Sequence, residues 1–359
     1  MLRTVWAKLE DRRRLYLIDE QCDFVEPVKV YLDHLAALEK SPHTLENYCR
    51  YLGRFFVFLR REGVDWRSIR PDDLVRFIQH LRSEHTNVTR LSERSVNTIV
   101  AAISSFYRYH IQRGEGHENP VLYEQISDRF GNFKRFLVHL NHGRTLRRSL
   151  KLKEPQPQIK TVADDDFTRF LSSIQNLQFK CIVMLMREGG LRVGEVLGLW
   201  IQDVEFHRNG IWIRRRSGLV NQALAKNLRD GDERFVDLSP SLMALLDQLV
   251  LKHNFDTDHL FVVLKKNARD KHHQPRYGRP LNRHAVKAMF QHYSRKNDLH
   301  VHAHMLRHTH ATELIRANWD VSYVRQRLGH AHIESTMVYV HLNEDDMRAK
   351  WQQFQETLR

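Results

Sequence analysis

The chain has 359 residues, of which 42% are hydrophobic and 28% are charged, and this length predicts two globular domains. Lys and Arg total 57 against 43 Asp and Glu. The net charge of +14 excludes an acidic, solvating chain and favours a polyanionic partner, most simply nucleic acid or an anionic membrane. A basic enzyme without such a partner is the alternative that the charge leaves open.

The cysteines and the apolar runs indicate the compartment. Cys22, Cys49 and Cys181 are odd in number and far apart, which argues against a disulfide scaffold or a cysteine zinc module. The N-terminus has no uninterrupted apolar run of the kind found in signal peptides. The longest apolar run, Cys181–Met186, is too short to span a bilayer. We therefore expect a cytoplasmic protein with no membrane partner.

Residues 1–26 are basic and predict an irregular extension, and residues 27–120 predict a helical domain. Apolar residues recur at helical spacing in four segments of this domain. Ser41 followed by Pro42 is a typical helix start, and Gly63 is a typical end. Four amphipathic helices with short connections predict a small bundle. Their segments run from Val28 to Leu38, from Pro42 to Gly63, from Pro71 to Leu81 and from Ser92 to Gly114.

Residues 121–160 predict a basic linker. The part from Asn141 to Lys160 carries six Lys and Arg residues against the single acid Glu154, and prolines follow the basic run. Such a segment is stiffened by proline and attracted to a polyanion, although a merely solvated linker is the alternative. The preceding part, Val121–Leu140, is partly apolar and favours a further helix.

The second half of the chain mixes helices with short strands, so the fold class is mainly α with a small β-sheet. Ile211–Ile213, Arg234–Leu238 and His259–Leu264 predict strands. No Walker loop or GxGxxG sequence is present, so nucleotide-driven chemistry has no support. The predicted helices are Asp164–Ile174, Phe179–Arg187, Val193–Leu199, a helix from Pro240 through Leu249, Asn282–Arg295, His304–Ala317, Val321–Leu328 and Ser335–Val340.

Several residues of this half suit phosphate chemistry when they are taken together. His304 and Arg307 lie three apart, on one face of a predicted helix. Arg192 follows the flexible pair Gly189-Gly190, His330 follows Gly329 at a helix end, and Tyr339 lies on the next helix. A guanidinium matches phosphate oxygens with two parallel hydrogen bonds. Each residue alone has a plainer interpretation as a surface arginine, a packing histidine or a core tyrosine.

The combined pattern resembles the tyrosine recombinases of the phage-integrase family. The matching pieces are GLRVGE from Gly190, HMLRHTHAT from His304, and LGH from Leu328 with Tyr339 nine positions after His330. The SPHTL run from Ser41 resembles that family's helical core-binding domain. The resemblance extends from about Pro27 to His341, and the stretch around Asn221–Lys226 is most similar to the integrase-type transposases of site-specific transposons.

The resemblance implies a fold, a reaction and a set of roles. Residues 27–120 would form a SAM-like core-binding domain, and residues 161–342 a mixed α/β catalytic domain. Tyr339 would attack a DNA phosphate and form a 3′-phosphotyrosyl link without any cofactor or metal. Arg192 and Arg307 would bind the phosphate oxygens, with His304 as a base or ligand and His330 as a further donor.

The family also uses a lysine on a β-hairpin as the acid that protonates the leaving 5′-oxygen. Lys226 is the candidate, because it lies between the strands predicted at Ile211 and Arg234. Arg229 is a poorer proton donor because its pKa is too high. A contact between Lys226 and the DNA backbone is the alternative.

A histidine cluster next to these residues raises the question of zinc. His300, His302, His304, His308 and His310 lie close together in the sequence, and His304 and His308 are four apart. An HExxH site would need Glu where Met305 stands, so we expect no metal. We expect His308 and His310 to pack or to line the DNA-facing cleft.

The resemblance further implies double-stranded DNA clamped between the two domains and a tetramer joining two duplexes, with helper proteins as possible partners. Residues 343–359 predict an amphipathic helix that docks on a neighbouring protomer, or else on its own domain. Alternative functions are a type IB topoisomerase-like enzyme, a DNA-binding regulator without cleavage activity, and a zinc hydrolase. The apolar face of this last helix consists of Met347, Trp351, Phe354 and Leu358.

Overall fold

The computed structural model describes residues 2–9, 12–83, 90–115, 119–121, 123–125, 146–148, 150–155, 159–216, 221, 223, 225, 232–269, 274–340, 351 and 354–356. The chain divides into two compact units, an N-terminal unit (Met1–Gln156) and a C-terminal unit (Pro157–Arg359). The division falls inside the stretch 121–160 that the sequence predicts as a linker. Among the described residues, no helix is both long and apolar enough to cross a lipid bilayer.

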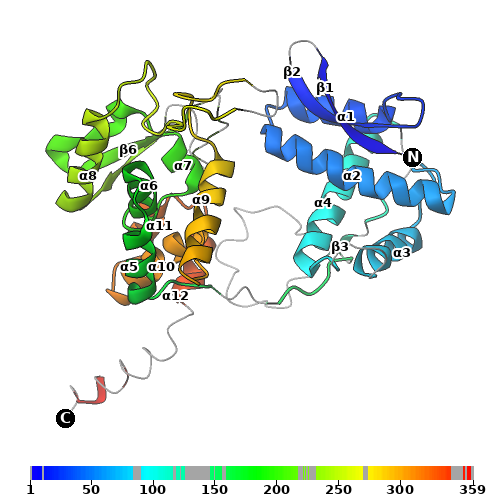
Figure 1. Ribbon diagram of the computed structural model, residues 1–359. Coiled ribbons are helices and arrows are strands. Elements are labelled where there is room, and N and C mark those ends of the chain that lie inside the picture. Colours follow the sequence, from blue (N-terminus) through cyan, green and yellow to red (C-terminus); the bar gives the residue numbers. More distant parts are fainter. Residues whose placement is uncertain are drawn as a thin grey trace. The chain divides into compact units, whose positions relative to one another are not determined.

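The N-terminal unit is built on the predicted helical bundle (Figure 1). The Ser41 side chain accepts a hydrogen bond from the Thr44 backbone N–H, and the helix that begins there ends at Gly63 with φ of +67°. Phe55, Phe77 and Phe106 are fully buried in the shared core. The helices are α1 (Glu26–Ala37), α2 (Pro42–Glu62), α3 (Pro71–Arg82) and α4 (Glu93–Gln112).

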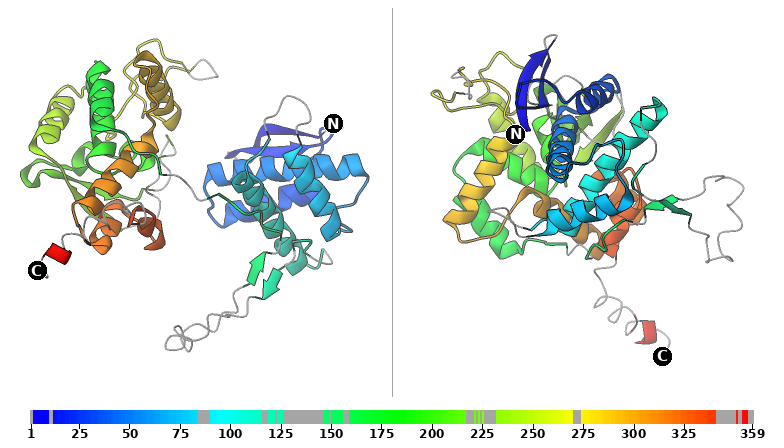
Figure 2. Two further views of the ribbon diagram at one scale, coloured as in Figure 1. Left: turned by 90° about the horizontal axis from the view of Figure 1, so that it is seen from below. Right: turned by 90° about the vertical axis from the view of Figure 1, so that its right-hand side faces the viewer.

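The first residues form a β-hairpin, and the prediction of an irregular extension is wrong. Strand β1 (Arg3–Leu9) pairs antiparallel with β2 (Arg12–Ile18), and the hairpin lies against α2 (Figure 1 and Figure 2). Leu15 and Leu17 are buried in the helical core, and a Cβ added to Gly53 of α2 would lie 3.3 Å from Leu17 Cδ1. This packing is a tertiary contact, so the basic composition of the segment does not reveal it.

Parts of the predicted linker belong to the N-terminal unit. Strand β3 (Tyr123–Gln125) pairs with β4 (Leu146–Arg148), where the sequence favours a helix at residues 121–140. Leu152 packs on the helical core, and its backbone N–H donates to Asn97 Oδ1 at 2.9 Å. The rest of the predicted helix lies outside the described residues.

The C-terminal unit surrounds one apolar helix, α6. Cys181 to Val183 and Leu185 of this helix are fully buried, and α6 contacts both α8 and α10. In Figure 1, α8 lies to the left of α6 and α9 lies to its right. The helices are α5 (Asp164–Ser173), α6 (Leu177–Arg187), α7 (Val193–Leu197), α8 (Pro240–Leu251), α9 (Arg283–Lys296), α10 (Ala303–Arg316), α11 (Val321–Leu328) and α12 (Glu334–Val340).

A small antiparallel sheet with the order β5-β6-β7 completes this unit, so the predicted fold class is confirmed. Ile211 lies opposite Val236 in the register. Residues 259–264 form only isolated bridges, one of them between Val262 and Pro280, rather than the predicted strand. Proline has no N–H to extend such a ladder. The strands are β5 (Val204–Glu205), β6 (Gly210–Arg214) and β7 (Glu233–Asp237), with short 3₁₀ turns η2 (Ile201–Asp203) and η3 (Phe206–Arg208).

Candidate active site

Arg192 begins α7 after a turn that only glycine fits. Gly190 has φ of +63°, and a Cβ there would lie 2.5 Å from His310 Cδ2. The Arg192 backbone N–H donates to Glu195 Oε2 at 2.8 Å, which fixes the first turn of the helix. The glycine turn and this cap together set the direction in which the Arg192 side chain leaves the backbone.

Glu195 is a buried carboxylate on which three arginines converge. Its Oε1 accepts from Arg192 Nη1 at 2.8 Å, and its Oε2 accepts from Arg234 Nη2 at 3.0 Å. Arg307 Nη1 lies 3.8 Å from Oε2. Burial by itself raises the pKa of Glu195, but the charges of Arg234, Arg307 and Arg192 lower it below its ordinary value. Three guanidinium groups around one ionised carboxylate leave a net positive charge that suits a phosphate.

Arg307 is held by main-chain oxygens. Its side chain is 5% exposed, Nη1 donates to the Gly190 carbonyl at 2.6 Å, and Nη2 donates to the Leu328 carbonyl at 2.7 Å. Burial, followed by the nearby charge of Arg192, lowers the pKa of Arg307 to about 9. The guanidinium therefore remains charged at neutral pH.

The C-terminal end of α11 binds both predicted site arginines. Arg192 Nη1 donates to the Leu328 carbonyl at 3.3 Å, and Arg192 Nη2 donates to the Gly329 carbonyl at 3.1 Å. These carbonyls form the negative end of a helix dipole, which favours a cation. The same helix end is followed directly by His330, so the backbone ties that histidine to both arginines.

Replacing Gly329 by alanine tests this helix end. Gly329 has φ of +63°, and a Cβ there would overlap the Arg234 guanidinium. We expect lower stability of the C-terminal unit and a large loss of the DNA cleavage that the family resemblance implies, measured by thermal unfolding and by formation of covalent protein–DNA adducts. The left-handed backbone alone costs alanine about 1–2 kcal/mol.

Gly63→Ala is the matched control for that backbone cost. Gly63 has φ of +67°, and a Cβ there would meet no atom within 4 Å. It lies at the end of α2, in the other unit. Equal losses of cleavage in the two variants would contradict the role given to the end of α11.

His330 is neutral and is held by a buried threonine. Its Nδ1 lies 2.8 Å from Thr336 Oγ1, and Thr336 is fully buried. Burial, then the charges of Arg307 and Arg192, lower the pKa of His330 to about 3. A neutral ring that accepts from Thr336 at Nδ1 presents an N–H donor at Nε2.

Tyr339 is buried against two histidine rings. Its side chain belongs to α12 and the residue is 4% exposed. Its Oη lies 2.8 Å from His308 Nδ1, and its ring stacks on His330 with centroids 6.4 Å apart at 6°. Burial raises the pKa of Tyr339, although the charges of Arg307 and Arg192 oppose this effect, so the phenol keeps its proton at neutral pH.

The structure describes one of the remaining two predicted site residues, His304, but not the other, Lys226. His304 is exposed in the first turn of α10, and its ring centroid is 6.4 Å from that of His308. Lys226 lies outside the described residues. Nearby Asn221 is buried and donates to the Leu197 carbonyl at 2.9 Å, which anchors the start of that segment beside α7. Among the described residues, no group of three or more His, Cys, Asp or Glu side chains is arranged to hold a metal ion.

Side-chain and main-chain contacts therefore link most of the catalytic residues that the sequence analysis predicts. Arg192 and Arg307 share the Leu328 carbonyl, His330 follows directly, and Tyr339 stacks on His330. His304 joins the group through its ring contact with His308.

Comparison with known proteins shows the family to which the chain belongs. Residues 160–346 match the phage integrase family, and residues 28–114 match the N-terminal SAM-like domain of phage integrases. The first match alone covers more than half of the chain. The chain belongs to the phage integrase family of tyrosine recombinases. The resemblance on which the sequence analysis relies is thus confirmed.

Curated relatives of this recombinase match along almost its whole length. Transposase A from transposon Tn554 of Staphylococcus aureus is 35% identical over 352 residues, covering 95% of this chain and 94% of the relative. Tyrosine recombinase XerA of Pyrococcus horikoshii is 25% identical over 334 residues, covering 91% and 94%.

Solved structures share the fold. The Tn1549 transposon integrase in complex with transposon right end DNA has a TM-score of 0.64 at 17% identity, covering 91% of this chain and 99% of that chain. XerH recombinase bound to a palindromic difH substrate has a TM-score of 0.61 at 17% identity, covering 88% and 80%. These likenesses concern the fold alone.

Two residues of the candidate site were not predicted from the sequence in these roles. Arg234 reads as part of a strand, yet its side chain is 9% exposed and bonds Glu195. The sequence signal for this buried ion pair was an arginine on a predicted strand that leads into the core. His308 was expected to pack or to line the cleft, but it contacts the Tyr339 hydroxyl. His310 does pack, beneath Gly190, where its Nε2 accepts from Arg327 Nε.

Proposed function

We propose that this protein is a site-specific DNA recombinase or transposase that integrates or excises a mobile element, cutting and rejoining strands through Tyr339. The observation that carries the proposal is the buried Tyr339 phenol stacked on His330, with Arg192 and Arg307 bonded to the two residues before that histidine. Membership of the tyrosine recombinase family supports it. The named relatives are a transposase and recombinases, which favours recombination over a topoisomerase or a non-cleaving regulator.

The proposed reaction begins with attack by Tyr339 Oη on a DNA phosphorus. A bond from Oη to phosphorus forms, the bond from phosphorus to the 5′-oxygen breaks, and a 3′-phosphotyrosyl link results. The covalent link conserves the energy of the broken bond, so rejoining needs no nucleotide hydrolysis. Attack by a different 5′-hydroxyl on this link completes recombination.

The arginines and His330 stabilise the charge on the phosphate in this proposal. Arg192 and Arg307 bind the non-bridging oxygens, where negative charge is greatest in the transition state. Because carbonyls and Glu195 already hold both side chains, little reorganisation is needed when DNA binds. His330 donates from Nε2, His304 binds the phosphate or assists as a base, and Lys226 protonates the leaving oxygen.

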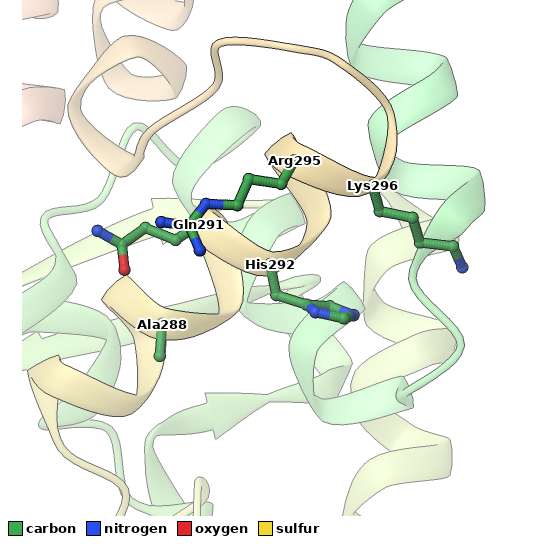
Figure 3. Close-up of a pocket in the computed structure, with 5 residues that line it drawn as sticks. All are labelled: Ala288, Gln291, His292, Arg295 and Lys296. Atoms are coloured by element: carbon green, nitrogen blue, oxygen red, sulfur yellow. The ribbon is translucent and has the colours of Figure 1, made fainter.

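We further propose that α9 contacts the DNA backbone. Its exposed face carries a hollow lined by Ala288, Gln291, His292, Arg295 and Lys296 (Figure 3). In Figure 3, the Gln291 and Arg295 side chains extend to one side of the helix and those of His292 and Lys296 to the other. Exposed donors at this spacing suit successive phosphates.

Salt dependence checks the role of α9. Arg295→Ala is expected to weaken DNA binding and to reduce the slope of log affinity against log salt by about 0.9, the value for one phosphate contact. Lys252→Ala is the control, because it removes the same charge from the exposed end of α8. Identical slopes for the two variants would argue against a contact made by α9.

The proposed function includes an assembly of four protomers on DNA, a cytoplasmic location and possible helper proteins. Four protomers would join two duplexes, with residues 343–359 of each protomer docking on a neighbour. Most of that tail lies outside the described residues, but Trp351 and Phe354 are 59% and 52% exposed, and their ring centroids are 5.8 Å apart. Such a pair suits burial against another surface. Helper proteins can join the assembly, and a cytoplasmic location is expected for an enzyme that acts on cellular DNA.

The decisive test of the proposal traps the covalent intermediate. Genomic fragments pulled down with the full chain supply the DNA site, and a nick beside the cleavage position lets the 5′-end diffuse away after attack. We expect an SDS-stable protein–DNA adduct in the presence of EDTA. Tight binding to the confirmed site without an adduct would contradict the proposed function.

A further inference from the structure

The phenol of Tyr339 has a specific histidine partner that the six predicted site residues do not include. His308 Nδ1 lies 2.8 Å from Tyr339 Oη, and the two ring centroids are 5.7 Å apart. His308 follows Arg307 on α10, so the backbone of one helix positions both a phosphate ligand and this partner. A base that takes a proton in a reaction must lie within about 2.6–3.2 Å of the group that gives it.

We propose that His308 accepts the phenolic proton of Tyr339 during strand cleavage, whereas the family resemblance implies His304 as a base or phosphate ligand. This inference rests on the proposed function. It assigns His308 as a catalytic residue, because its ring nitrogen contacts the attacking oxygen itself.

The proton balance of the step is complete. As Oη bonds to phosphorus, the oxygen can no longer keep its proton, which moves to His308 Nδ1. The electron pair of the broken bond stays on the 5′-oxygen, which takes a proton from Lys226. In rejoining, His308 returns its proton to the tyrosine oxygen, and Lys226 recovers a proton from the attacking 5′-hydroxyl. Both residues are then ready for the next cycle.

The surroundings of His308 keep its ring unprotonated, and so able to accept a proton, until DNA binds. Burial, followed by the charges of His304, Arg307 and His302, lowers the pKa of His308 to about 4, so the ring is neutral before DNA binds. A neutral ring with its proton on Nε2 accepts at Nδ1. A bound phosphodiester adds negative charge beside the ring, which stabilises the imidazolium that the transfer creates.

Two substitutions of His308 separate proton acceptance from simple positioning. His308→Asn keeps an oxygen acceptor near the place of Nδ1 but cannot take up a proton, and His308→Ala removes the ring. For both we expect adduct formation to slow by about 10²–10⁴-fold, the usual contribution of a general base. Imidazole in solution is expected to restore part of the rate to His308→Ala. His300→Ala, at an exposed histidine outside the site, is the matched control and should react at the wild-type rate.

A second substrate shows on which side of the phosphate His308 acts. A nicked site with sulfur in place of the leaving 5′-oxygen needs no acid, because a thiolate leaves unaided. The deficit of the His308 variants should persist on this substrate. A deficit that disappears there would overturn the proposal, because His308 would then act on the leaving group.

Other results of the adduct assay would overturn the assignment of His308 or the proposed function itself. A wild-type rate for His308→Asn, with DNA binding intact, would show that hydrogen bonding is sufficient and would also overturn the assignment. Failure of the wild-type protein to form an adduct on either substrate would instead remove the proposed function, and this inference with it. If His308→Ala alone loses DNA binding, the adduct rate of His308→Asn, which fills the same space more closely, decides the assignment: a slowed rate supports it and a wild-type rate overturns it.

Discussion

Tyr339→Phe is expected to form no SDS-stable adduct on the nicked site while binding that site as tightly as the wild-type protein does. The change removes one oxygen, which in the proposed reaction is the nucleophile. In other enzymes that use covalent catalysis, loss of the nucleophile lowers the rate by a factor on the order of 10⁶. The measurement is adduct yield by denaturing electrophoresis beside a binding titration.

The cost of this substitution to folding should be limited to the loss of one hydrogen bond. The phenyl ring still stacks on His330, but His308 Nδ1 loses its partner, which costs about 1–3 kcal/mol when the group is buried. Tyr323→Phe is the matched control, because Tyr323 is 64% exposed on α11 and should form adducts normally. Loss of DNA binding by Tyr339→Phe would argue against the assignment, since one phenolic oxygen does not hold a duplex.

Glu195→Gln is expected to disable the site and to destabilise the C-terminal unit by about 3–5 kcal/mol, the usual result of removing one partner from a buried ion pair. The amide keeps the shape of the side chain but leaves Arg192, Arg234 and Arg307 without a compensating charge. We expect the arginines to separate and adduct formation to fall. Denaturant unfolding and the adduct assay measure the two effects.

Asp203→Asn provides the comparison for Glu195→Gln. Asp203 is fully buried in the same unit and accepts from Arg214 at 2.9 Å and from Arg216 at 2.7 Å. We expect a similar loss of stability but a much smaller loss of cleavage. If the two variants lost cleavage equally at matched stability, Glu195 would have no special role in the site.

The sequence predicts those parts of the fold that local signals determine. Helix α2 was located by a serine cap, an apolar stripe and a terminal glycine, all of which act within a few residues. The β1–β2 hairpin was missed because its stability comes from Leu15 and Leu17 packing on α2, a contact that the basic composition of the segment hides. The sequence predicts a strand near Val262, where the structure has only isolated bridges. An apolar run does not reveal whether a pairing partner exists.

The candidate site likewise contains residues that the sequence predicts and residues whose role depends on tertiary contacts. The resemblance to the tyrosine recombinases predicted a common phosphate site for Arg192, Arg307 and Tyr339, and the structure links these residues through α11 and His330. The ion pair of Arg234 was missed, because it depends on the tertiary fold that brings β7 beside the Glu195 carboxylate. The same is true of His308, whose contact with Tyr339 depends on how α12 packs on α10. The role of Lys226 stays a prediction.

The shared carbonyl of Leu328 also determines when the site can assemble during synthesis and folding of the chain. Its two arginine partners come from α10 and from the start of α7, and Tyr339 lies beyond it on α12. Contacts between such distant parts of a chain cost more loop-closure entropy than local contacts, and they need the residues up to Tyr339 to be in place. A growing or partly unfolded chain therefore has the positive charge that attracts DNA but no assembled site. We therefore expect such a chain to bind DNA without cleaving it.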